Sequence, residues 1–117
     1  MIERLVRTLQ VLAAPSDVQL TLSPRFDMQA EELAGDFDDA RRLLYDCPQV
    51  EVGAHQRDCL DRVHAVLDER SGVAGFWTEA AIRTSPEWEE LRGLARSALA
   101  SFGLPIARRP LSRALAR

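Results

Sequence analysis

Apolar residues recur every three or four positions along most of this chain, with polar residues between them. Residues 2–13 and 28–46 show the pattern over the greatest length. A repeat near 3.6 residues places apolar side chains on one side of an amphipathic helix, so each segment is predicted to be helical. The apolar positions are Ile2, Leu5, Val6, Leu9, Leu12 and Ala13 in the first segment, and Leu33, Phe37, Ala40 and Leu44 in the second.

Boundary signals separate these helices from their neighbours. Pro15 and Pro48 follow the two segments, and a helix rarely continues into proline. Ser16 to Gln19 matches a capping box, in which the glutamine side chain reaches back to the serine backbone, so a short helix is predicted over 17–22. Similar signals predict three more helices, over 54–70, 78–83 and 86–102.

No segment alternates apolar and polar residues as a half-buried strand does, apart from the short Val50–Val52. The prediction is an all-α, single-domain bundle of about four main helices plus short helical turns. Residues 1–103 form the domain, and residues 104–117 form a basic, proline-containing tail.

The composition supports a globular protein with an uneven charge distribution. The 117 residues are 46% hydrophobic and 28% charged, with a formal net charge of −3. Segment 27–46 holds seven acidic residues and two arginines, whereas 104–117 holds four arginines and no acidic residue. All fifteen basic residues are arginine, but most are dispersed along the chain, so we attribute the bias to genome composition rather than to phosphate recognition.

Six of the carboxylates lie within residues 27–39, and no basic residue occurs among them or after them until Arg41. On a helix, Glu32, Asp36 and Asp39 share one face, where like charges repel by about 0.2–0.5 kcal/mol per pair. Gly35 between them costs a helix interior about 1 kcal/mol more. A face that lowers the stability of its own helix is a candidate docking site for a cationic partner.

Helical spacing gives some of these acids a partner and leaves others without one. Asp38 lies four residues before Arg42, the favourable order for an ion pair within a helix. Asp36 and Asp39, with Glu32 beside them, have no basic residue at helical spacing. Two interpretations stay open, a face that is only solvated and a face that binds a partner, with Asp38 at its margin. Three further pairs have this spacing: Glu3–Arg7, Asp58–Arg62 and Glu79–Arg83.

Trp77 is a second candidate at the edge of this face. It follows Phe76 in a glycine-containing connection before a short helix. A tryptophan in such a connection is usually a core side chain under a loop. The alternative is an exposed anchor at an interface, where tryptophan is enriched among the residues that dominate binding.

The residues that carry chemistry are few. His55 and Cys59 are four residues apart, but catalytic zinc needs three protein ligands and structural zinc needs four. The acidic segment lacks the order of an EF-hand loop, and no nucleophile elbow or phosphate-binding loop occurs. We therefore predict no catalytic residue, no metal site and no cofactor. A metal-dependent hydrolase built on His55, Cys59 and nearby acids is the remaining enzymatic alternative.

The two ends of the chain bear on the location of the protein and on whether it binds nucleic acid. Residues 1–14 lack the apolar run of a signal peptide, and no stretch approaches the roughly 20 apolar residues of a membrane span. A cytoplasmic protein with reduced Cys47 and Cys59 is expected. The tail arginines are a weak footprint for nucleic acid, which the isoelectric point of about 5.4 opposes.

Four blocks occur in this order along the chain: Leu22–Phe26, Glu31–Ala40, Phe76–Ile82 and Ser85–Arg92. Together they resemble a group of small uncharacterised bacterial helical proteins. Some proteins of this kind resemble the immunity proteins of contact-dependent growth inhibition and related toxin systems. Immunity proteins share no chemical motif, so the resemblance carries over no functional residue.

The resemblance implies a non-enzymatic immunity protein that binds and blocks a cognate, basic toxin domain. Acidic residues favour such a partner through charge complementarity. The alternative is a structural or regulatory helical module that acts as a homo-oligomer, with the arginine tail of one copy against the acidic face of another. The predicted partner-binding residues are Glu32, Asp36, Asp38, Asp39 and Trp77.

Overall fold

A computed structural model describes residues 2–22 and 26–104, and the side chains of 3–21 and 32–104. The predicted tail, apart from Leu104, lies outside the described residues. Within them every regular element is helical, which confirms the all-α prediction. The elements are α1 (Ile2–Ala13), α2 (Ser16–Leu22), α3 (Phe26–Tyr45), α4 (Ala54–Arg70), the 3₁₀ turn η1 (Ala74–Trp77), α5 (Glu79–Thr84) and α6 (Pro86–Ser101).

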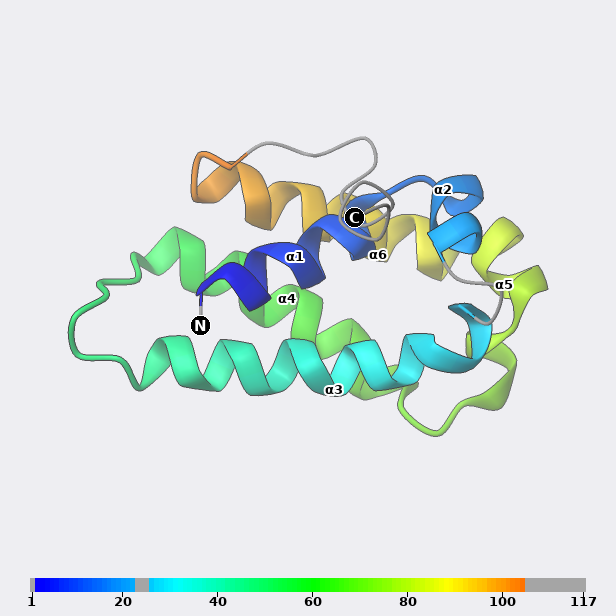
Figure 1. The fold of residues 1–117 in the computed structure, drawn as a ribbon, viewed down its shortest axis with the longest axis horizontal. Helices are drawn as coiled ribbons and strands as arrows, with labels where there is room; N and C mark the ends of the chain where they lie inside the picture. The colour runs from blue at the N-terminus through cyan, green and yellow to red at the C-terminus, as the bar shows by residue number, and fades with distance from the viewer. Residues whose placement is uncertain (1, 23–25, 105–117) are drawn as a thin grey trace.

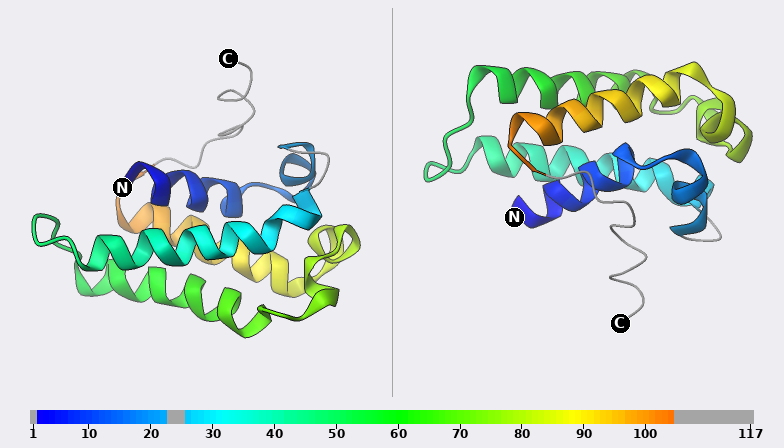
Figure 2. Two further views of the ribbon diagram at one scale, coloured as in Figure 1. Left: turned by 60° about the horizontal axis from the view of Figure 1, so that its bottom comes forward. Right: turned by 90° about the horizontal axis from the view of Figure 1, so that it is seen from above.

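Four long helices build the body of the molecule. Helix α6 packs against both α1 and α4, and α3 packs against the same two helices from the other side. Seen from above, α4 and α6 lie on one side of the bundle and α1 and α3 on the other (Figure 2). The short elements α2 and α5 gather at one end of the bundle, and the connection from α3 to α4 lies at the opposite end (Figure 1).

The core follows the apolar stripes predicted from the sequence. Leu9 on α1, Phe37 on α3 and Leu60 on α4 are almost completely buried and belong to one hydrophobic cluster. Trp88 at the start of α6 is the largest fully buried side chain, and its ring stacks on that of Phe76 at a centroid distance of 4.8 Å. Each long helix therefore buries in the core the apolar face that its sequence period predicts.

Most helix ends form as the boundary signals predict. The Ser85 hydroxyl accepts a hydrogen bond from the Glu87 backbone N–H at 3.2 Å and begins α6. Gly72 and Gly103 follow α4 and α6 with φ of 82° and 69°, in the left-handed region that glycine adopts without strain.

The capping box predicted at Ser16 is wrong. Gln19 instead donates to the backbone carbonyls of Val11 and Leu12, at 2.9 and 3.1 Å, and accepts from Arg92 at 3.0 Å. A buried amide satisfies its hydrogen bonds wherever packing provides partners. Here the end of α1 lies closer than the helix start, so Gln19 caps the preceding helix.

None of the helices in the described part of the chain combines the length and the apolar character needed to cross a membrane.

Candidate functional site

Asp36 has a basic partner that helical spacing does not reveal. Arg4, on α1, donates to its carboxylate at 3.0 Å, and both side chains are half exposed. The prediction that Asp36 is uncompensated is therefore wrong. The physical reason is that α1 packs beside α3, so a residue 32 positions away in sequence supplies the charge.

Asp38 lies at the centre of an ionic cluster. It accepts from Arg41 at 2.9 Å and from Arg42 at 3.0 Å, the latter being the predicted pair, and His64 on α4 lies 3.3 Å away. Burial raises the pKa of the Asp38 carboxyl, but the Arg41 hydrogen bond and the charge of Arg42 outweigh it and hold the pKa below its ordinary value. Asp38 therefore serves the α3–α4 contact and offers little to a partner.

Further contacts of Arg41 link this cluster to Asp61 on α4 and to Tyr45 at the end of α3. Arg41 also binds Asp61 at 3.1 Å, and Asp61 accepts from the Tyr45 hydroxyl at 2.7 Å. The Arg57 guanidinium lies 3.9 Å from the centroid of the Tyr45 ring. Burial and the hydrogen bond to Asp61 raise the pKa of Tyr45 to about 12. These contacts join α3 to α4, although the buried Arg41 Nε donates to no partner in the described structure.

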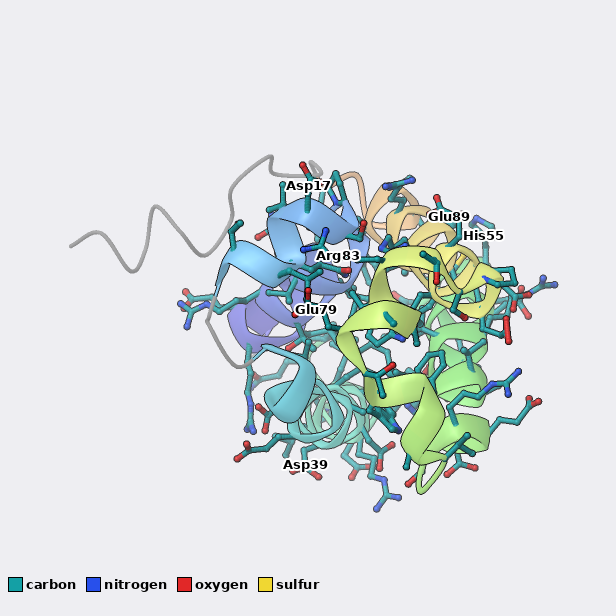
Figure 3. The ribbon with its side chains drawn as sticks, turned by 90° about the vertical axis from the view of Figure 1, so that its right-hand side faces the viewer. Asp17, Asp39, His55, Glu79, Arg83 and Glu89 are labelled. Atoms are coloured by element: carbon teal, nitrogen blue, oxygen red, sulfur yellow. The ribbon has the colours of Figure 1, made fainter. Side chains whose placement is uncertain are left out.

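Other acids on α3 remain without an ionic partner. Glu32 and Asp39 are exposed and form no ion pair within the described residues, and the same holds for Asp46, which directly follows α3. Asp39 lies at the outer edge of the molecule and points away from the helices (Figure 3). Leu43 is 50% exposed, one of two large hydrophobic side chains exposed in the described part of the chain.

These four residues occur at i, i+7, i+11 and i+14, so they occupy one side of the helix. We call them the outer α3 surface: Glu32, Asp39, Leu43 and Asp46. Sequence reasoning missed Leu43 and Asp46. The available signal was their spacing from Asp39, because Leu43 falls four residues later and outside the apolar stripe that ends in Leu44.

Trp77 is not an exposed anchor. Only 8% of its surface is accessible, and its indole N–H donates to the Arg70 carbonyl at 2.9 Å. Its ring meets those of Phe76 and Trp88 edge-on, with centroids 4.9 and 6.0 Å apart. The interpretation of Trp77 as an exposed anchor is therefore wrong, because the connection folds over the bundle and inserts the indole into the core.

His55 and Cys59 are adjacent, with the imidazole Nε2 3.8 Å from the thiol sulfur. Both cysteines of the chain are free. Across residues 2–22 and 26–104, no group of three or more histidine, cysteine, aspartate or glutamate side chains is placed to hold a metal ion. The pair by itself supplies fewer ligands than a catalytic zinc site uses.

Comparisons with protein-family models, curated proteins and solved structures find no match for this chain. The immunity function therefore stays a prediction that depends on the sequence resemblance and on the outer α3 surface.

Proposed function

We propose that this protein is a non-enzymatic binding module whose outer α3 surface recognises a basic protein partner. The observation that carries the proposal is the composition of that surface. Glu32, Asp39 and Asp46 form no ion pair within the described residues, and the half-exposed Leu43 lies among them. Protein interfaces commonly combine an apolar centre with a charged rim of complementary sign.

The electrostatics of α3 favour a cationic partner. The arginines of the helix itself are engaged, since Arg41 binds Asp38 and Asp61 while Arg42 binds Asp38. A basic partner would bring together opposite charges that the isolated chain leaves exposed to solvent. Such complementarity raises the association rate and excludes acidic competitors.

Within this class, we propose that the protein is an immunity protein that occludes a toxin domain. Occlusion needs no catalytic group. It needs an interface of roughly 800 Å² on each partner, a modest part of the accessible surface of 6902 Å². The support is the sequence resemblance together with the acidic character of the outer α3 surface.

The test uses the protein encoded beside this chain in its genome. If that reading frame encodes a large protein with a C-terminal toxin domain, the domain is co-expressed with this chain and cell growth is measured. We expect wild type to protect the cells. Asp39→Arg combined with Leu43→Asp should abolish protection and weaken the purified complex at least tenfold, a loss of about 1.4 kcal/mol.

The matched control is Glu69→Arg on α4. Glu69 is also exposed and forms no ion pair in the described part of the chain, so this variant introduces arginine in the same way away from the proposed interface. It should protect like wild type. Full protection by the folded Asp39→Arg, Leu43→Asp variant would exclude the outer α3 surface as the binding site.

A further inference from the structure

A groove of about 200 Å³ lies between α3 and α4, with η1 at one end. The two helices run side by side, as the turned view shows (Figure 2). Ala34, Leu67 and Trp77 supply apolar lining, and the polar residues Asp38, His64 and Asp68 also line the groove. The volume suits a single long side chain, since sites for drug-sized ligands start near 300 Å³.

Gly35 keeps this groove open. It lies in the interior of α3, it lines the groove, and a Cβ added to it would meet no atom within 4 Å. Its φ is not positive, so the backbone conformation does not require glycine. Glycine costs a helix interior about 1 kcal/mol relative to alanine, and here it leaves an unfilled space beside the outer α3 surface.

The polar lining is suited to a cation that carries several hydrogen-bond donors. Asp68 is exposed and forms no ion pair within the described residues. His64 faces Asp38 through Nδ1 at 3.3 Å. In the neutral tautomer that donates from Nδ1, the other ring nitrogen, Nε2, is an acceptor. One carboxylate and one imidazole acceptor beside apolar lining match the charged head and aliphatic stem of a long basic side chain.

We propose that the groove receives an arginine side chain of the basic partner. The stem lies over the Gly35 backbone and Leu67, and the guanidinium lies between Asp68 and His64. Arginine is favoured over lysine because its planar head is weakly hydrated and presents five donors. This inference rests on the proposed function. It adds that the basic partner presents an arginine side chain beside the outer α3 surface.

The chain's own tail would have to run along the length of the bundle to reach the groove. Leu104 follows the end of α6, which lies at the opposite end of the bundle from α5 (Figure 1). Trp77, at the η1 end of the groove, belongs to the turn that packs against α5.

The test titrates the full-length, isotope-labelled chain with acetyl-Gly-Arg-Gly-amide and follows the amide resonances. Saturable shifts are expected at Gly35, Leu67 and Ser71, which line the groove. The same peptide with citrulline, which keeps the shape of arginine without its charge, should give none. Gly35→Leu and Asp68→Asn should each weaken the arginine peptide at least fivefold, since one fills the space and the other removes the charge.

Gly93→Leu is the matched control. Gly93 lies in the interior of α6, a Cβ there also meets no atom within 4 Å, and it does not line the groove. Both leucine variants should fold, because leucine is a far better helix former than glycine. Equal binding by Gly35→Leu and wild type would overturn the proposal, as would the absence of saturable shifts.

One further variant separates the sources of arginine. Changing all four tail arginines to glutamine in the full-length chain should leave affinity for the peptide unchanged. Markedly tighter binding by this variant would show that the tail occupies the groove and would overturn the assignment to a foreign partner. Because this test does not involve Leu43 or Asp39, it can fail while the outer α3 surface is upheld, and the reverse also holds.

Discussion

At the scale of single residues, Asp38 shows how a predicted interface residue acquires a structural role. Its carboxylate lies within hydrogen-bonding distance of Arg41, Arg42 and His64, and its side chain is only 23% exposed. Replacing it removes the acceptor shared by Arg41 and His64, which is costly because both side chains are largely shielded from water. The acidic cluster of α3 is thus divided between residues that hold the bundle and residues that face solvent.

We expect Asp38→Asn to lower the free energy of unfolding at pH 7 by about 1–3 kcal/mol. The folded-state pKa of Asp38 lies below its ordinary value, so its contribution is fully present above the unfolded pKa and is lost as pH falls through the folded value. The difference between wild type and variant should therefore shrink below about pH 4.

Urea denaturation at pH 7 and at pH 3 measures this difference. Asp58→Asn is the control, because the Asp58–Arg62 pair is 57% and 65% exposed and contributes about 0–1 kcal/mol. A variant of Asp38 that unfolds like wild type at pH 7 would contradict the role of the cluster.

Trp77 belongs to the core, and this gives a second prediction. Trp77→Phe keeps an aromatic ring but removes the hydrogen bond to the Arg70 carbonyl. We expect a loss of about 1–2 kcal/mol in thermal unfolding and unchanged affinity for any partner of the outer α3 surface. A stable variant that fails to bind would restore Trp77 as an interface residue.

At the scale of elements, the end of α1 depends on side chains from other helices. Helix α1 has no basic residue in its last turn. Gln19 donates to two of its final carbonyls, and Arg96 on α6 donates to that of Ala13 at 3.1 Å. Arg92 then holds the Gln19 amide oxygen, so α1, α2 and α6 meet in one buried polar network.

We expect Gln19→Leu to destabilise the protein by about 2 kcal/mol or more, because it leaves buried carbonyls and the Arg92 guanidinium short of partners. The loss should appear as fast amide exchange at the end of α1 and as a lower melting temperature. Gln49→Leu, in the exposed connection after α3, should change stability by less than about 0.5 kcal/mol. Equal stability of the two variants would contradict the network.

At the scale of the whole molecule, exposed apolar surface bears on self-association. Within the described residues, only Leu43 and Val73 are large hydrophobic side chains with high exposure. Permanent homodimers usually bury extensive apolar interfaces. We therefore expect the isolated chain to be monomeric.

Sedimentation of the full-length protein should give the mass of one chain, 13.1 kDa. Removing residues 105–117 should lower this mass only by that of the removed segment. A dimer that becomes a monomer on removal of the tail would instead support the homo-oligomer alternative, in which tail arginines meet the acidic face of another copy.

Contacts between residues close in sequence could be predicted more reliably than contacts between helices. The helices over 2–13 and 54–70 were predictable, since period and capping act between residues a few positions apart. The ion pairs Asp58–Arg62 and Glu79–Arg83 were predictable for the same reason. The predicted Glu3–Arg7 pair does not form in the described structure. The neighbouring Arg4 forms an ion pair with Asp36 on α3.

The sequence by itself determined the helices, their buried stripes and the acidity of α3, because these depend on local spacing and side-chain chemistry. Only the tertiary structure decided which acids stay available. Packing brought Arg4 to Asp36 and His64 to Asp38, inserted Trp77 into the core and left Asp39 facing solvent. Charge compensation between helices depends on which faces meet, and one-dimensional spacing holds no information about a neighbour 32 residues away.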